Sequence, residues 1–315
     1  MRVLRFCDRE SQVPRYAVLI GDGVVELHPS FEAAGVEAAG WPLPAQVVHL
    51  SETGSGDLRP ADKRLEDVRL LAPCPVRSFR DFYAFEQHVR NARRKRGLEM
   101  VPEWYEAPVF YFSNTAGIVG PGAEVRKPPD THELDYELEL GVVIGKEGGD
   151  IPVEEADSYI AGFTIINDWS ARDLQRREMK VGLGPAKGKD FATSLGPYLV
   201  TPDGLEERVL PDRSRGKRYD LTMTASVNGR EYSRGNARDM NWTFAELIAR
   251  ASRNTVLKPG DLIGSGTVGT GCIVEFPEGT YPWLQPGDIV RLEIEGLGVL
   301  ENAVVGSGAI RADAE

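Results

Sequence analysis

The sequence predicts a mixed α+β protein in which strands outnumber helices. Short apolar runs recur along the chain and are bounded by glycine, asparagine and aspartate, which is typical of strands joined by tight turns. Polar and apolar residues alternate in "ELDYELELGVVIG" (133–145), and only a few stretches have helical spacing. With 315 residues and 41% hydrophobic content, the chain is long enough for one or two domains with a large core.

The N-terminal part predicts a small domain of its own. The runs "YAVLI" (16–20) and "VVELH" (24–28) flank a Gly-Asp-Gly turn, which favours a β-hairpin. The segment "SETGSGDLRPADK" (51–63) is polar and contains glycine and proline, as linkers do. We therefore expect a small N-terminal domain over 1–72 and a second domain over 73–315.

Helices are expected at four places in the second domain. The first is 78–97, where Phe82, Phe85, Val89 and Ala92 have helical spacing. Others are expected near 153–160, over 170–178 and from Thr243 onward. Ser170 and Asp173, like Thr243 and Glu246, have the spacing of a capping box.

Strands fill most of the remaining length. They are predicted on both sides of an Asn228-Gly229 hairpin turn and in these runs: 109–112, 136–145, 162–168, 261–266, 272–276, 288–296 and 297–305.

Composition excludes several classes of function. The net charge of −11 argues against binding to nucleic acid or to an anionic membrane surface. The three cysteines are few and widely separated, so they are expected to be reduced thiols in a cytoplasmic protein. The N-terminus lacks an apolar signal region, and no apolar run approaches transmembrane length.

Two glycine-rich segments resemble nucleotide motifs without fitting them. The residues Gly264, Gly266 and Gly269 match GxGxxG, but that motif must open a helix and this run leads into a predicted strand. The segment "GPAKGKDF" (184–191) has only three residues between its glycines and no Ser or Thr after Lys189. Neither segment predicts a nucleotide site.

The strand at 133–145 carries an unusual row of carboxylates. A strand would place Asp135, Glu137 and Glu139 on one face, where like charges repel. A solvated acidic face is the simplest interpretation. The alternative is a bound cation, and all-oxygen ligands would favour Mg²⁺, Mn²⁺ or Ca²⁺. Residue composition alone leaves these two alternatives open.

Other candidates for chemistry lie outside that strand. Asp168 ends an apolar strand just before a helix, and Asp81 is expected near the start of the first helix with His88 two turns later. The other histidines, His28, His49 and His132, lie beside proline, apolar residues or threonine and are expected to be structural or solvated.

Five motifs together resemble the fumarylacetoacetate hydrolase (FAH) family in order and approximate spacing. They are "DFYAFEQH", "LDYELELG", "NDWSARDLQ", "GKDFATSLGP" and "GDLIGSGT", and the resemblance covers roughly 73–308. It implies an FAH-type mixed β-roll catalytic domain behind a small N-terminal domain, and usually a homodimer.

The resemblance also implies roles for individual residues. The family's metal carboxylates fall on Asp81, Glu137, Glu139 and Asp168. His88 matches the catalytic histidine and Glu275 the acid that orients it. Lys189 and Thr193 match groups near the metal, with Lys189 and Gln175 expected to stabilise an oxyanion. The positions that match the substrate pocket are Tyr83, Tyr111, Gln175 and Thr267.

The activity implied is hydrolysis of a carbon–carbon bond in a diketo acid, with Mg²⁺ as the expected cofactor and a small diketo acid as the partner. Two departures leave the substrate open: Met179 stands where fumarylacetoacetases have tyrosine, and Gly97 where they have a substrate-binding arginine. Arg93, Arg94 or Arg96 could supply that charge. The same family includes keto-acid decarboxylases and isomerases of aromatic catabolism, which is the alternative function.

Overall fold

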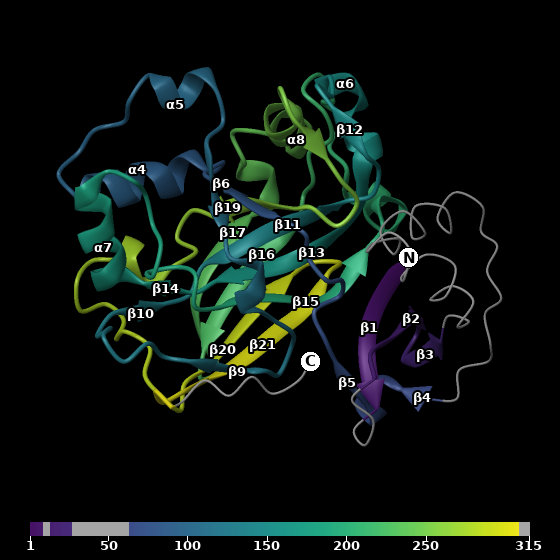
Figure 1. Ribbon diagram of the computed structural model, residues 1–315, viewed down its shortest axis with the longest axis horizontal. Coiled ribbons are helices and arrows are strands. Elements are labelled where there is room, and N and C mark those ends of the chain that lie inside the picture. The colour runs from purple at the N-terminus through teal and green to yellow at the C-terminus, as the bar shows by residue number, and fades with distance from the viewer. Residues whose placement is uncertain (9–12, 27–62, 309–315) are drawn as a thin grey trace.

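The structure is a computed structural model that describes residues 1–8, 13–26 and 63–308 (Figure 1). In these residues two β-sheets dominate, as the sequence predicts, with helices at the margins. His28, His49 and the predicted linker, except its last residue Lys63, lie outside the described residues.

The larger sheet has twelve strands among the described residues. Ten follow one another in spatial order: β4 (Lys63–Arg64), β3 (Gly23–Glu26), β2 (Arg15–Ile20), β1 (Arg2–Asp8), β15 (Thr193–Val200), β13 (Ile160–Asp168), β11 (Leu138–Ile144), β19 (Leu262–Thr267), β6 (Phe79–Phe82) and β7 (Phe110–Ser113). The other two are β5 (Val68–Leu70), beside β1, and β8 (Ile118–Val119), beside β15. The N-terminal strands therefore join the large sheet through the β1–β15 pair.

The second sheet has five strands among the described residues and packs against the first. In order they are β17 (Arg230–Asn236), β16 (Thr222–Val227), β20 (Ile289–Ile294), β21 (Gly298–Val305) and β9 (Glu124–Arg126). Buried residues alternate with half-buried ones along β16 and with exposed ones along β20, so each strand has one face in the core. The strands β11, β13 and β15 are buried along their whole length, because both faces of the large sheet are covered there.

Short helices and bridges connect these strands. The α-helices are α4 (Glu86–Lys95), α5 (Glu103–Glu106), α6 (Val153–Ala156), α7 (Arg172–Val181) and α8 (Phe244–Ser252). Two-residue strands form two further pairs, β10 (Leu134–Asp135) with β14 (Ser170–Ala171) and β12 (Gly148–Gly149) with β18 (Val256–Leu257). The 3₁₀ turns are η1 (Leu65–Asp67), η2 (Thr115–Gly117), η3 (Asp157–Tyr159), η4 (Pro202–Arg208), η5 (Ala237–Asp239) and η6 (Ile273–Glu275).

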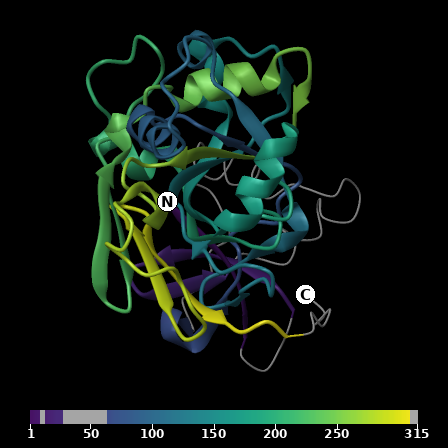
Figure 2. The same ribbon diagram turned by 90° about the vertical axis from the view of Figure 1, so that its left-hand side faces the viewer.

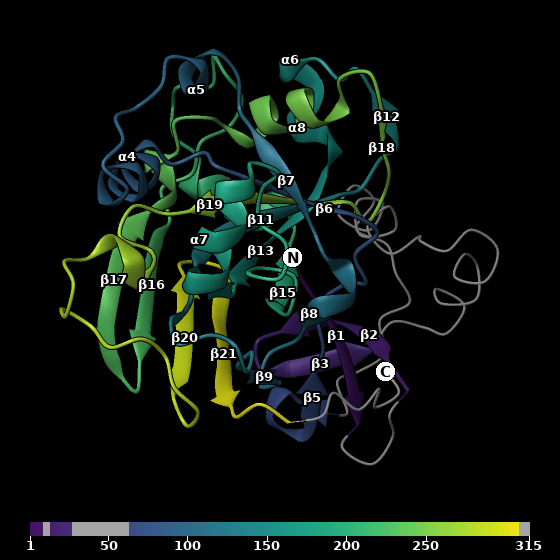
Figure 3. The same cartoon turned by 60° about the vertical axis from the view of Figure 1, so that its left-hand side comes forward.

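The N-terminal strands lie far from the helices α6 and α8. Figures 2 and 3 show β1 to β5, coloured purple to blue, at the lower end of the molecule, with α6 and α8 at the upper end. No described helix is long and apolar enough to span a lipid bilayer.

Three sequence expectations about local structure are wrong. The segment expected to be one helix from residue 78 is strand β6 followed by α4, so Asp81 lies on a strand. The expected strand at 272–276 is instead the 3₁₀ turn η6. Ser170 does not cap α7, since its hydroxyl donates to the Asp168 carbonyl, whereas the capping box of Thr243 and Glu246 is confirmed.

Candidate active site

Three buried carboxylates converge on neighbouring strands of the large sheet. Asp81 lies on β6, Glu139 near the start of β11 and Asp168 at the end of β13. In the sheet, β13 is next to β11, and β19 separates β11 from β6. One oxygen from each carboxylate lies within 4.8 Å of the others. All three residues are at most 3% exposed. Strands that are far apart in sequence therefore place three acidic groups at one point.

These carboxylates have oxygens that lack a protein partner. Asp81 Oδ1, Glu139 Oε2 and Asp168 Oδ1 are buried and accept no hydrogen bond. Burial first, and then the charges of neighbouring carboxylates, raise the pKa of Asp81 and of Glu139 well above its ordinary value. Buried, unpaired oxygens of this kind are hard donors that fit Mg²⁺, Mn²⁺ or Ca²⁺. The donor set therefore fits a divalent cation.

A glycine on the neighbouring strand leaves space for the Asp81 carboxylate. Gly264 of β19 pairs with Asp81 of β6, and a methyl group at Gly264 would collide with Asp81 Oδ1 and approach the Phe79 ring to 3.0 Å. Gly266 has a positive φ of 75°. The GxGxxG lookalike is thus part of the strand beside the carboxylates, which explains its glycines without a nucleotide.

Glu137 lies beside the cluster but pairs with cations of the chain. Its carboxylate accepts from Lys189 Nζ and lies 2.8 Å from Arg172 Nη2. Burial alone would raise the pKa of Glu137, but Lys189 and Arg172 outweigh it and lower that pKa to about 2. In this arrangement Glu137 is not in the group of three with free oxygens.

Asp135, to which the sequence assigns no role, is a buried structural hub. Its Oδ2 accepts from Arg172 Nε at 2.9 Å and from the Val274 N–H at 3.1 Å, and its Oδ1 accepts from the Ile273 N–H at 2.8 Å. Asp135 lies on β10, which ends before β11 begins, so the three acidic residues do not share one strand face. This corrects the expectation that all three carboxylates lie on one strand face, and the hydrogen bonds tie Asp135 to the turn that carries Glu275.

The remaining expected pocket residues surround the carboxylates. Lys189 Nζ donates to Asp168 Oδ2 at 2.7 Å, and the Tyr111 hydroxyl donates to the same oxygen. Thr267 Oγ1 lies 3.4 Å from Glu139 Oε1, and Thr193 is the strand partner of Asp168. Gln175 lies one helical turn after Arg172 and accepts from its Nη1 at 3.2 Å.

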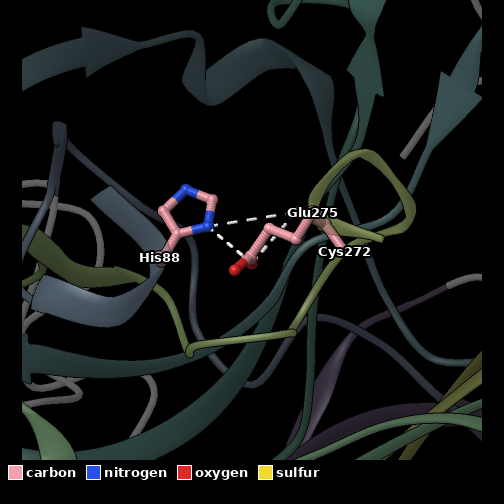
Figure 4. A group of neighbouring side chains, drawn as sticks. All are labelled: His88, Cys272 and Glu275. Carbon is pink, nitrogen blue, oxygen red and sulfur yellow. Dashed lines mark hydrogen bonds and ion pairs between the residues drawn. The ribbon is translucent and has the colours of Figure 1, made fainter. Parts of the chain in front are cut away.

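His88 and Glu275 form a buried pair. Glu275 Oε1 lies 2.7 Å from His88 Nδ1, with the other ring nitrogen pointing away from Glu275 (Figure 4). Glu275 Oε2 accepts from Asn91 Nδ2 and from the Thr270 N–H, both at 2.9 Å. Burial alone would raise the pKa of Glu275, but His88 and these hydrogen bonds lower it. Glu275 is therefore held ionised against Nδ1.

The pair and the carboxylates belong to one site. Tyr83, two residues after Asp81, places its ring edge-on to His88 with centroids 5.3 Å apart. Burial is the largest of the causes that raise the pKa of Tyr83 to about 12. The charge of His88 also helps to lower the pKa of Glu137. His88 is not one of the group of three carboxylates, and its contact with Tyr83 links it to the residue that follows strand β6.

The structure separates the three candidate arginines. Arg93 Nε donates to the Glu99 carbonyl at 2.5 Å, and Arg94 is exposed. Arg96 is exposed too, and its charge counteracts the rise in the pKa of Tyr83 that burial causes. Met179 lies on α7 and is 43% exposed. That it faces the substrate stays a prediction. His132 is exposed, as expected for a solvated residue.

Sequence reasoning missed Asn91, Arg172 and Cys272. Asn91 lies one helical turn after His88, a spacing that could have shown it to be a partner of the same acid. Arg172 lies inside the motif "NDWSARDLQ", and Cys272 lies three residues before Glu275. No local sequence pattern shows what either side chain contacts.

Known proteins share this fold and these segments. Residues 77–305 match the family model described as fumarylacetoacetate (FAA) hydrolase C-terminal. Mitochondrial oxaloacetate tautomerase Fahd2a of Rattus norvegicus is 33% identical over 327 residues, covering 97% of this chain and 92% of that protein. Fumarylacetoacetase of Mus musculus is 33% identical over 235 residues, but the match spans only 62% of this chain and 56% of that protein.

Solved structures agree. Fumarylacetoacetate hydrolase from Exiguobacterium antarcticum aligns with a TM-score of 0.75 at 27% identity, over 98% of this chain and all of the other. A 5-carboxymethyl-2-hydroxymuconate delta-isomerase from Mycobacterium smegmatis aligns with a TM-score of 0.67 at 28% identity, over the same shares. These relatives carry hydrolase, isomerase and tautomerase names. With its five motifs on one fold, the chain belongs to the fumarylacetoacetate hydrolase family of enzymes.

Proposed function

We propose that the chain is a divalent-metal-dependent hydrolase that cleaves a carbon–carbon bond in a diketo acid, such as an acylpyruvate or fumarylacetoacetate. The observation that carries the proposal is the buried pair of His88 and Glu275 beside three carboxylates with free oxygens. A positioned base and a cation site are the two parts that this hydrolysis needs.

The residues of the pair divide the work between them. Glu275 accepts from His88 Nδ1, so Nε2 is the ring nitrogen left to remove a proton from water. The imidazolium that results lies against an ionised carboxylate, which stabilises it. The hydroxide formed attacks the substrate carbonyl, and His88 later returns the proton to the carbon that leaves as an enolate.

The carboxylates and their neighbours hold the substrate end of the reaction. A divalent ion held by Asp81, Glu139 and Asp168 would act as a Lewis acid on the two oxygens of a 1,3-dicarbonyl acid. Lys189 orients Asp168 and Glu137 through its ammonium group. The Gln175 amide accepts from Arg172 through its oxygen, which turns its nitrogen toward other acceptors, such as a developing oxyanion. Arg96 is the arginine best placed to attract an acidic substrate.

A second candidate is tautomerisation or isomerisation of a 2-oxo acid. It is favoured by the match to oxaloacetate tautomerase, which covers nearly the whole of both proteins. The same histidine would then remove a proton from carbon rather than from water. Both reactions use one base and one cation, so the geometry alone fits either.

A substrate panel separates the two candidates. Purified protein with Mg²⁺ would be assayed against fumarylacetoacetate, fumarylpyruvate, acetylpyruvate and oxaloacetate. Hydrolysis consumes the diketo acid and releases two acids, whereas tautomerisation changes the keto–enol ratio without loss of material. If every diketo acid stays intact while oxaloacetate equilibrates faster, the hydrolase assignment is wrong and the second candidate replaces it.

The variant His88→Ala tests the role of the base. It should lower kcat for diketo-acid hydrolysis by roughly 10²–10⁴-fold, the usual contribution of a positioned base. His132→Ala is the matched control, because His132 is exposed and should leave kcat unchanged. Parent-level hydrolysis by His88→Ala would show that another group activates the water.

A further inference from the structure

A cysteine completes a second cluster of potential ligands around the histidine pair. Cys272 Sγ donates to Glu275 Oε1 at 3.4 Å and lies 3.9 Å from His88 Nδ1 (Figure 4). All three side chains are buried, and one donor atom from each lies within 4.8 Å of the others. The proposed hydrolysis uses the histidine and the glutamate but has no role for the thiol.

The chemistry of this cluster differs from that of the carboxylates. It offers one nitrogen, one sulfur and one oxygen, a set that selects borderline-soft ions such as Zn²⁺ over Mg²⁺. In a tetrahedral zinc site, the usual bond lengths place sulfur about 3.6 Å from nitrogen or oxygen, and nitrogen about 3.4 Å from oxygen. The two sulfur distances already straddle that value, and only the Nδ1–Oε1 separation of 2.7 Å must open.

The surroundings hold the donors in place. Glu275 Oε2 is fixed by Asn91 and by the Thr270 N–H, which leaves Oε1 directed at the cluster. Such outer hydrogen bonds are the usual support of a metal-bound carboxylate. His88 is mounted on α4 and Cys272 immediately before η6, so two separate elements supply the ligands. The cluster is thus built as a site rather than formed by one mobile side chain.

We propose that His88, Cys272 and Glu275 form a second, inhibitory cation site that takes Zn²⁺ or a similar borderline-soft divalent ion. On binding, the thiol gives its proton to solvent and becomes a thiolate ligand, while Glu275 exchanges its hydrogen bond with Nδ1 for the ion. Nδ1 releases its proton to solvent and binds the ion through the lone pair that this frees, while Nε2 takes up a proton from solvent, so the imidazole stays neutral.

Occupation of the site removes the base. A histidine with Nε2 protonated and Nδ1 bound to an ion has no free lone pair to accept a proton. Burial first, and then Glu275, raise the pKa of Cys272, so loss of the thiol proton is driven by the ion itself. The inhibition rests on the proposed role of His88, whereas ion binding by the cluster does not.

Cobalt spectroscopy tests binding without an activity assay. The full chain would be saturated with Mg²⁺ and titrated with Co²⁺, whose bond to a thiolate gives a charge-transfer band in the near ultraviolet. Carboxylates cannot produce that band, so it reports a thiolate ligand, and the cysteine variants identify which one. We expect it in the parent and in Cys74→Ala, which keeps Cys272, and not in Cys272→Ser.

Zn²⁺ inhibition of the Mg²⁺-loaded enzyme is the second measurement, with each variant compared with its own activity. For the same degree of inhibition, Cys272→Ser should need more Zn²⁺ than the parent. The difference should be at least roughly 10–100-fold, which is the usual effect of losing a partner that supports a bound ion. If Cys272→Ser loses its native circular dichroism, His88→Ala serves instead, because it keeps the thiol and should weaken Co²⁺ binding similarly.

The outcomes distinguish the two proposals. A cobalt band without inhibition supports the ion site and contradicts the role of His88 as base. No band in the folded parent overturns the ion site, and Zn²⁺ inhibition that is equally strong in the parent and in Cys272→Ser overturns its inhibitory role and assigns the inhibition to the carboxylates.

Discussion

At the scale of single residues, Asp135 shows how a carboxylate can be essential without being a ligand. It satisfies Arg172 and two backbone N–H groups of the turn that carries Glu275. Those partners lie 37 to 139 positions away in sequence, so no local pattern reveals them. Alternation along the strand marked Asp135 as notable, but only the fold distinguishes a structural acid from a metal ligand.

Asp135→Ala should destabilise the protein strongly. Removing one partner of a buried ion pair leaves the other charge uncompensated, which typically costs about 3–5 kcal/mol in free energy of unfolding. Urea unfolding of the variant measures this cost. Glu231→Ala is the control, since Glu231 forms an exposed pair with Arg234 and should barely shift the midpoint. Equal midpoints for the two variants would show that Asp135 is dispensable.

At the scale of elements, the sequence predicts strands better than boundaries. The predicted strands 162–168, 288–296 and 297–305 correspond to β13, β20 and β21, because their apolar residues recur over a long run that ends at turn residues. The predicted helix begins too early, at residue 78. Phe82 and Phe85 have the same helical spacing as the residues of α4, although Phe82 ends strand β6 and Phe85 precedes the helix. The run 272–276 is apolar enough for a strand. In the structure, however, the backbone forms a 3₁₀ turn there, and Glu275 forms a hydrogen bond with His88.

Asp173 gives α7 a pH-dependent anchor instead of the expected capping box. Burial alone would raise the pKa of Asp173, but hydrogen bonds from the His132 N–H, the Thr131 hydroxyl and the Leu174 N–H lower it. A lowered folded-state pKa contributes stability that is present above the unfolded value of about 3.9 and lost as pH falls through the folded value. This contribution belongs to the ionised carboxylate, so Asp173→Asn removes it.

The stability difference between the parent and Asp173→Asn should therefore be largest at neutral pH and shrink on acidification below pH 4. Urea midpoints of both proteins across that range measure it. A difference that stays constant, or grows as the pH falls, would mean that the side-chain charge is not what anchors the helix.

Gly264 tests whether strand β19 shapes the carboxylate cluster. An alanine there would collide with the Asp81 carboxylate and displace it from Glu139 and Asp168. Gly264→Ala should therefore lose Mg²⁺ affinity, measured by calorimetric titration. The control is Gly306→Ala, because Gly306 has open space around it and its φ is not positive. This variant should bind Mg²⁺ as the parent does. Gly229 is unsuitable as a control because its φ is positive.

At the scale of the whole molecule, the sequence predicted the fold class and the family but not the way the halves join. The β1–β15 pair makes the N-terminal strands part of the large sheet, and pairing between segments almost 200 positions apart leaves no local signal. The domain boundary at residue 72 stays a prediction. So does the homodimer, which sedimentation of the purified chain would test.

The buried charge of the site sets how the whole protein responds to a divalent ion. Besides Glu275, which pairs with His88, the site has five buried carboxylates (Asp81, Asp135, Glu137, Glu139 and Asp168) and two buried cations, Arg172 and Lys189. Burial first, and then neighbouring carboxylates, raise the pKa of Glu139, so its ionised form destabilises the metal-free fold at neutral pH. An ion that binds only the folded state offsets this, by about 2.7 kcal/mol at 100 times its dissociation constant.

Glu139→Gln should therefore reverse the order of stability. In EDTA the variant should melt at or above the temperature of the parent, because it lacks one buried charge. With Mg²⁺ the parent should gain several degrees while the variant gains little, because a charged ligand is missing. Glu133→Gln is the control, since Glu133 forms a partly exposed pair with Arg176 and should follow the parent in both conditions. If Mg²⁺ stabilises Glu139→Gln as much as the parent, the ion does not bind at these carboxylates.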